Sequence, residues 1–274
     1  MKEEVLDIHD LQELAPFFRS RFGTFLGKLM IKWLSVEKVN LVHRRSIHLR
    51  GAEFTSGILK DPLIDLKYNI HNKEVLSHLP EGAFVTVSNH PIGSLDGIIL
   101  IDIFARLRPD FKVMVNGVLT RIWAMGDNFI SVKPDSNKQG GNMQNINGVR
   151  LSLGQLKDGH PIGFFPAGAI SFKNKERKRV CDLPWTHSVV RLIRKSNVPV
   201  YPVYFDFLNT NFFYWLGQID WRIRTLRIPV EAFNKRGKTV DVYIGNPISP
   251  EEIKTITDDN ELARFLYEKT YNAK

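Results

Sequence analysis

The chain has 274 residues, 43% of them hydrophobic, and its 38 Lys and Arg against 29 Asp and Glu give a net charge of +9. This length and apolar content are sufficient for a sizeable core, which excludes wholesale disorder. The single cysteine, Cys181, excludes internal disulfides and clustered thiolate metal ligands, and it favours a reducing compartment. The basic excess leaves nucleic acid, an anionic membrane surface and an acidic protein open as partners.

The first ten residues, MKEEVLDIHD, lack the basic and apolar regions of a secretory signal, so we do not expect export. The most apolar windows, 22–34 and 84–101, are too short or are interrupted by charged and polar residues. The sequence therefore predicts no transmembrane segment.

Residues 11–35 carry aromatic and aliphatic side chains at helical spacing, which predicts one or two amphipathic helices. Two interpretations remain open for them. The helices can pack on the domain core, or they can form an in-plane membrane anchor whose basic residues contact anionic headgroups. The polar face of these helices holds four basic residues: Arg19, Arg21, Lys28 and Lys32.

From about residue 82, short β-rich runs alternate with helical patterns. The runs predict strands at 84–88, 111–115, 129–132, 162–165, 198–205 and 239–244. The other patterns predict helices at 96–107, 117–125, 143–157, 185–196 and 250–271. This alternation predicts an α/β fold with a mixed, mostly parallel sheet flanked by helices, and functional residues in the loops after the strands. We divide the chain into amphipathic, membrane-associating helices at 1–50 and an α/β domain at 51–274.

The segment VSNHPIGSLDG, residues 87–97, is the strongest local signal for chemistry. A β-rich run ends at Asn89 and His90, Gly93 permits a sharp turn, and Asp96 opens an apolar helix. Six positions separate His90 from Asp96, so the carboxylate can fold back, orient the imidazole and make it a general base. The alternative is structural, with Asp96 as a helix N-cap and His90 as a satisfied loop residue.

A second loop, GHPIGFFPAGAISF at 159–172, joins an apolar strand to a run of small residues around Gly168. Backbone amides in such a loop can approach a ligand closely and bind an oxyanion or a phosphate without a side chain. A turn without any ligand is the alternative.

Four segments in order resemble the four blocks of the glycerolipid acyltransferases, the 1-acylglycerol-3-phosphate acyltransferase-like superfamily. They are NHPIGSLDG at 89–97, GDNFI at 126–130, FPAGAIS at 165–171 and VPVYPV at 198–203. The six-residue step from His to Asp, the segment KWLSVEKVN and residues 209–249 are similar to the haemolysin-like branch. That branch resembles bacterial O-acyltransferases of ornithine and glycine lipids.

The resemblance implies transfer of a fatty acyl group from acyl-ACP or acyl-CoA to the hydroxyl of a lysolipid, without a covalent acyl-enzyme. It implies His90 as the catalytic base and Asp96 as the carboxylate that orients it. No bound cofactor and no metal ligand are expected. It also implies substrate contacts by residues in and near the blocks: Asn89, Gly93, Phe165, Pro166, Gly168, Lys133 and Lys173.

The third block departs from the usual Phe-Pro-Glu-Gly-Thr-Arg, because Ala167, Ala169 and Ile170 stand in place of Glu, Thr and Arg. The second block likewise has Lys133 where an Arg is usual. Because Arg is the best ligand for a phosphate dianion, these changes favour a lyso-amino lipid of the ornithine or glycine class. Lysophosphatidate stays open as acceptor, since Lys133, Lys173 or Arg177 can supply the cation. A non-catalytic, lipid-binding function also stays open.

Other features are assigned less specific roles. Ser94 and Ser171 lack the Gly-x-Ser-x-Gly elbow of a serine hydrolase, and residues 212–216 fit either a lipid-facing patch or an inner element. The basic run at 173–179 is expected to be a solvated loop. No nucleic-acid-binding motif occurs. The resemblance, together with the basic amphipathic start, implies a peripheral enzyme on the cytoplasmic face of the inner membrane, with an acyl carrier protein as an open second partner.

Overall fold

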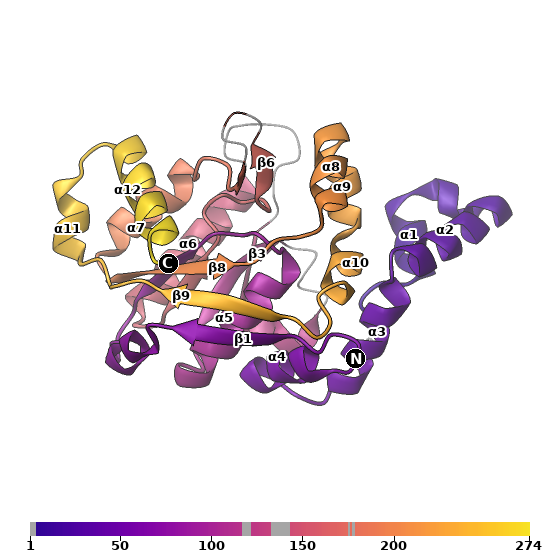
Figure 1. Ribbon diagram of the computed structural model, residues 1–274, viewed down its shortest axis with the longest axis horizontal. Helices are drawn as coiled ribbons and strands as arrows, with labels where there is room; N and C mark the ends of the chain where they lie inside the picture. The colour runs from indigo at the N-terminus through magenta and orange to yellow at the C-terminus, as the bar shows by residue number, and fades with distance from the viewer. Residues whose placement is uncertain (1–3, 117–121, 133–142, 175, 177–178) are drawn as a thin grey trace.

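The computed structural model describes residues 4–116, 122–132, 143–174, 176 and 179–274 (Figure 1). Its centre is a seven-stranded sheet in the order β1-β9-β8-β2-β5-β3-β4. Neighbouring strands are parallel except for the antiparallel β8–β9 pair, which confirms the predicted mixed, mostly parallel sheet. The strands are β1 (Lys67–His71), β2 (Val85–Ser88), β3 (Lys112–Asn116), β4 (Phe129–Val132), β5 (Ile162–Phe164), β8 (Val200–Asp206) and β9 (Thr239–Ile244).

The middle of the sheet is buried on both faces, because β2, β5 and β8 are short apolar runs with almost no exposed residue. Gly163 on β5 is needed there, since a Cβ at this position would lie 2.9 Å from both Phe111 and Thr86. His90 and Phe165 follow β2 and β5, so the two loops predicted to carry chemistry leave the same end of adjacent parallel strands.

Two apolar clusters cover the sheet. One cluster joins the sheet to α4 (Gly51–Lys60) and α5 (Ser94–Leu107). The other joins it to α6 (Met143–Lys157), α7 (His187–Ser196) and α12 (Asp259–Tyr271). The remaining elements of the domain are η2 (Lys73–His78), η4 (Trp123–Asn128), α8 (Asn211–Ile219), α9 (Trp221–Leu226), α10 (Ile228–Phe233) and α11 (Pro250–Thr255).

The N-terminal segment forms α1 (Ile8–Leu14), η1 (Pro16–Arg19), α2 (Arg21–Trp33) and α3 (Val36–Ser46), drawn in indigo at one end of the molecule (Figure 1). The buried residues of α2 are its glycines, Gly23 and Gly27, and a Cβ at Gly27 would lie 2.7 Å from Ile8. α2 therefore packs on α1 through small residues while its aromatic side chains face outward. No helix in the described part of the chain is long and apolar enough to cross a bilayer.

Three expectations are corrected by the structure. In addition, the sequence does not predict strand β1, because its edge sequence KYNIH is largely polar. The run expected as a loop at 173–179 contributes to a small antiparallel hairpin of β6 (Phe172–Asn174) and β7 (Arg179–Cys181). The helix predicted at 250–271 is two helices, because Asp258 caps a new start. The described part of the predicted 117–125 helix is 3-10 rather than α-helical, and residues 117–121 lie outside the described residues.

Candidate active site

His90 and Asp96 come together as their spacing predicts. His90 Nδ1 lies 2.9 Å from Asp96 Oδ2, and the Asp96 side chain is fully buried while that of His90 is 20% exposed. Asp96 thus holds one ring nitrogen, and Nε2 is the nitrogen left to face a substrate.

Asp96 also organises the turn between strand and helix. The backbone N–H groups of Ile92 and Gly93 both donate to Asp96 Oδ2 at 2.9 Å. Helix α5 begins at Ser94, so Asp96 lies in its first turn rather than at the N-cap. The N-cap alternative for Asp96 is therefore wrong, because Gly93 is the N-cap. One oxygen of the carboxylate instead binds both the turn and the imidazole.

Gly93 is required by the backbone of this turn. Its φ is +103°, a conformation that side chains disfavour, and a Cβ would lie 2.9 Å from Ile170 Cδ1. Gly93 is a predicted substrate-binding residue, and the structure gives it a clear role in shaping the loop.

Phe165, Pro166 and Gly168 form a tight turn beside His90. The His90 and Phe165 rings have centroids 4.3 Å apart at 34°. The amide of Gly168, where φ is +65°, donates to Phe165 O at 2.9 Å. This amide closes the turn and is therefore engaged within the loop, and the substrate contact expected at Gly168 stays a prediction.

Asp182 is a buried carboxylate that the sequence did not single out. It accepts hydrogen bonds from the His90 amide at 3.2 Å and from the Ser171 hydroxyl, and Ser171 N donates to His90 O at 2.9 Å. Burial raises the pKa of Asp182. Because the Ser171 hydroxyl is bound to Asp182, the structure gives this serine a structural role rather than that of a nucleophile.

Asn89 ties the two central strands together at the base of the site. Its amide nitrogen donates to Phe205 O at 3.0 Å and its oxygen accepts from Phe205 N at 2.7 Å. Both polar ends of the side chain are engaged by the backbone, so Asn89 fixes the place where His90 leaves β2.

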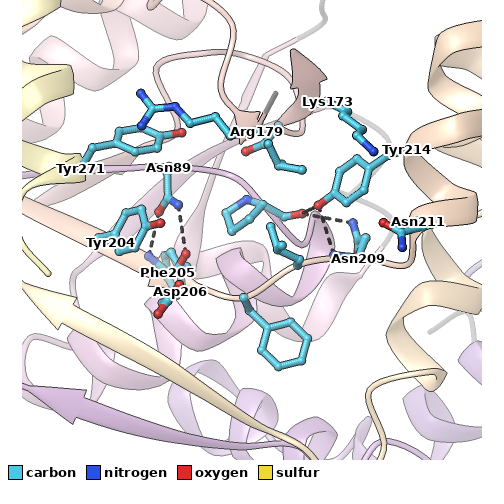
Figure 2. A pocket seen from close by; sticks show the side chains of 15 residues that line it. Asn89, Lys173, Arg179, Tyr204, Phe205, Asp206, Asn209, Asn211, Tyr214 and Tyr271 are labelled. Atoms are coloured by element: carbon cyan, nitrogen blue, oxygen red, sulfur yellow. Dashed lines mark hydrogen bonds between the residues drawn. The ribbon is translucent and has the colours of Figure 1, made fainter. Parts of the chain in front are cut away.

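A pocket of about 400 Å³ lies beside the loop (Figure 2). Figure 2 shows Lys173 on the side of Tyr214 and Arg179 on the side of Tyr271. Both cations come from the β6–β7 hairpin and are exposed. Lys133 lies outside the described residues. The walls come from the end of β2, the hairpin, the chain after β8 and the last helix: Asn89, Pro91, Ser171, Lys173, Arg179, Val180, Tyr204, Phe205, Asp206, Phe207, Leu208, Asn209, Asn211, Tyr214 and Tyr271.

A second set of buried polar residues supports the His90 loop. Asn209 Nδ2 donates to the carbonyls of Pro91 and Ile92, both at 3.1 Å. Its oxygen accepts from Lys235 Nζ, whose pKa burial lowers to about 8. These residues lie in the 209–249 segment of the family resemblance, but no sequence spacing links them to His90.

Arg224 supports the third-block loop in the same way. Its guanidinium donates to the carbonyls of Ser171 and Ile170, both at 3.2 Å, and burial lowers its pKa. The chain from α8 to α10 therefore holds both loops that meet at His90. Among the described residues, no three His, Cys, Asp or Glu side chains are placed to hold a metal ion.

The chain is similar to known acyltransferases. The family model described as "Acyltransferase" matches residues 9–274. A lyso-glycine lipid O-acyltransferase from Phocaeicola vulgatus is 24% identical over 283 residues, covering 99% of this chain and 97% of the relative. The enzyme of the same name from Bacteroides thetaiotaomicron is 25% identical over 259 residues, covering 90% and 91%.

One solved structure is also similar, the 1-acyl-sn-glycerophosphate (LPA) acyltransferase PlsC from Thermotoga maritima. It shares 16% identity, with 89% of this chain and 92% of that chain covered and a TM-score of 0.49. The family match spans nearly the whole sequence and includes both loops at His90. The chain therefore belongs to the acyltransferase family.

Proposed function

We propose that this protein is an O-acyltransferase that moves a fatty acyl group from an acyl thioester to the hydroxyl of a lysolipid. The observation that carries the proposal is the His90–Asp96 pair, 2.9 Å apart at the end of a central strand, in a chain of the acyltransferase family. No other imidazole among the described residues stands at the carboxyl end of a central strand with a buried carboxylate as its partner.

The proposed reaction has a single displacement. His90 Nε2 takes the proton of the acceptor hydroxyl as its oxygen attacks the thioester carbonyl. The C–S bond breaks, the new ester forms, and the imidazolium returns its proton to the leaving thiolate. Asp96 keeps the imidazole in the required tautomer and stabilises its cation.

The acceptor is proposed to be a lyso-amino lipid of the glycine class. Ile170, in the place of the usual third-block Arg, is buried with Phe213 and Tyr214 and offers no cation to a phosphate. The names of both relatives support the same class. A glycine acylated on its amino group keeps its carboxylate, and the pocket offers Lys173 and Arg179 to pair with it.

The test is product formation by the purified protein with labelled acyl-ACP and acyl-CoA in separate reactions. A lyso-glycine lipid, a lyso-ornithine lipid and lysophosphatidate compete as acceptors in one mixture. We expect the diacyl glycine lipid as the main product, and the donor reactions decide between carrier protein and coenzyme A. Preferential acylation of lysophosphatidate would overturn the proposed acceptor.

We further propose that residues 1–50 hold the catalytic domain, residues 51–274, on the cytoplasmic face of the inner membrane. The outward-facing aromatic residues of α2 and its basic neighbours support this. A fusion of residues 1–50 to a soluble reporter should bind anionic vesicles. Absence of binding by the fusion, together with binding by the full chain, would contradict this assignment.

A further inference from the structure

Helices α8 and α9 expose an unusually apolar outer face. We call this the α8–α9 surface. Each of its large side chains is between 46% and 58% exposed, and they are Leu208, Phe212, Trp215, Ile219, Trp221, Ile223 and Leu226. The rings of Phe212 and Trp215 stack with centroids 5.6 Å apart, and a concentration of exposed apolar side chains on neighbouring helices marks a binding surface.

The inner face of the same helices is well packed. Phe213 and Tyr214 are buried against Ile170, and Arg224 reaches the third-block loop. The helices are therefore held firmly on the domain, and their outer face needs a partner of its own. The exposed face is thus distinct from the face with which these helices pack on the domain.

The charges around this face favour an anionic lipid surface. Asp220 is the one acidic residue in the sequence between Phe207 and Val230, and its carboxylate is engaged by the amide of Arg222 at 2.6 Å. The guanidinium groups of Arg222 and Arg227 lie 5.6 Å and 4.8 Å from the ring centroids of Trp221 and Phe212. Arginine paired with aromatic rings at the edge of an apolar face suits the boundary between lipid tails and headgroups.

A second face of the same character lies nearby. The exposed side chains Phe17, Phe22, Phe25, Leu29 and Trp33 belong to η1 and α2, and no acidic residue occurs in the sequence between Glu13 and Glu37. Figure 1 shows α1 and α2 at the same end of the molecule as α8, α9 and α10. Lys38 of α3 lies 5.6 Å from the Phe233 ring of α10, so the helix that follows α2 contacts the helix that follows α9.

We propose that the α8–α9 surface is a second membrane-binding element, which inserts its apolar side chains into an anionic bilayer beside α2. This goes beyond the membrane role assigned to residues 1–50. Arg224 and Asn209 join this part of the chain to the loops at His90. The α8–α9 surface therefore places the proposed active site at the lipid surface, where a lysolipid resides.

The test replaces Trp215, Ile219 and Trp221 together with Ser in the full-length chain. Binding is measured by flotation with vesicles of phosphatidylcholine containing phosphatidylglycerol, and also on His90→Ala protein, so the result does not depend on acyl transfer. We expect vesicle partitioning to fall by at least about tenfold, since three exposed apolar side chains are lost. The control is Leu151→Ser, an isolated exposed leucine on α6 at 58% exposure, which should leave binding unchanged.

A charge variant tests the electrostatic part of vesicle binding independently. Arg222→Gln is expected to weaken binding to the anionic vesicles about fivefold, as one basic residue near the surface contributes roughly 1 kcal/mol, and to leave binding to pure phosphatidylcholine unchanged. Circular dichroism melts check that all variants are folded.

Two outcomes would overturn the proposal. One is unchanged vesicle binding by the triple Ser variant while Phe22→Ser with Phe25→Ser abolishes binding. The other is a concentration-dependent oligomer in solution that the triple variant dissociates, which would assign the surface to a protein partner.

Discussion

Gly93 sets the turn that brings His90 onto Asp96. The turn needs a positive φ of +103°, while the amide of Gly93 donates to the Asp96 carboxylate. Sequence reasoning identified this glycine as the point of a sharp turn. It could not give the φ of +103°, which is what disfavours a side chain at this position.

We expect Gly93→Ala to lower the free energy of unfolding by about 1–3 kcal/mol, because an alanine is strained in this backbone conformation. Acyl transfer should fall with it, since the His90 loop must shift. Urea denaturation and initial rates measure the two effects. Gly82→Ala is the matched control, because a Cβ there meets nothing within 4 Å, and an equal loss in both variants would contradict the account.

Lys235 belongs to the buried polar residues that support the His90 loop, and it makes the free energy of unfolding depend on pH. Its pKa is lowered by burial to about 8 in the folded protein, so between about pH 8 and 10.5 the unfolded chain binds more protons at this residue. Stability from this group therefore rises with pH across that window. It is constant below the window, where both states are protonated, and above it, where both are neutral.

We measure the unfolding free energies of wild type and of Lys235→Met by denaturation from pH 7.5 to 10.5. The difference in unfolding free energy between the two proteins should shift in favour of wild type by about 2–3 kcal/mol across the window. The comparison removes other groups that titrate in the same range. A difference independent of pH would show that Lys235 is not buried as a cation next to Asn209.

At the scale of elements, the apolar strands and the His90 loop were predictable, whereas the supports of the loop were not. β2, β5 and β8 are apolar runs whose residue types alone specify buried strands. His90 and Asp96 are close in sequence, so local spacing was sufficient. Asp182 and Asn209 act on His90 and Pro91 from 92 and 118 residues away, and only the strand order brings them there.

Helix α9 carries Arg224, and a substitution there tests whether this helix positions the third-block loop. Arg224→Lys keeps the charge but cannot form the two guanidinium bonds to the carbonyls of Ser171 and Ile170. We expect kcat to fall about ten- to a hundredfold with a smaller change in KM, since the reacting groups lose their alignment.

The matched control for this variant is Arg222→Lys on the same helix. Arg222 is exposed, and a soluble short-chain acceptor keeps its proposed membrane role out of the assay. Equal kcat values for the two lysine variants would mean that Arg224 does not position the loop.

Over the whole molecule, the net charge of +9 is explained in part by basic residues that lie beside exposed apolar side chains. Exposed apolar side chains are concentrated on α2 and on α8–α9, with basic residues beside them. Composition alone left nucleic acid, membrane and acidic protein open. The arrangement of side chains is the basis for the proposed anionic membrane partner, and Arg224 joins the third-block loop to the α8–α9 surface.

Salt should therefore separate binding from chemistry. Raising ionic strength is expected to release the protein from anionic vesicles, because screening weakens the attraction of exposed charges. Turnover of a soluble short-chain acceptor should change little over the same range. Co-sedimentation and initial rates measure the two responses, and vesicle binding that is insensitive to salt would show that apolar insertion alone holds the protein.

The central claim is that His90, oriented by Asp96, is the base of an acyl transfer. The most direct measurement is the initial rate of acyl transfer by purified His90→Ala and Asp96→Asn proteins whose circular dichroism matches that of wild type. We predict a loss of at least about a hundredfold in both variants. A folded His90→Ala protein that retains more than about a tenth of the wild-type rate would contradict the claim, because general-base catalysis contributes more than that.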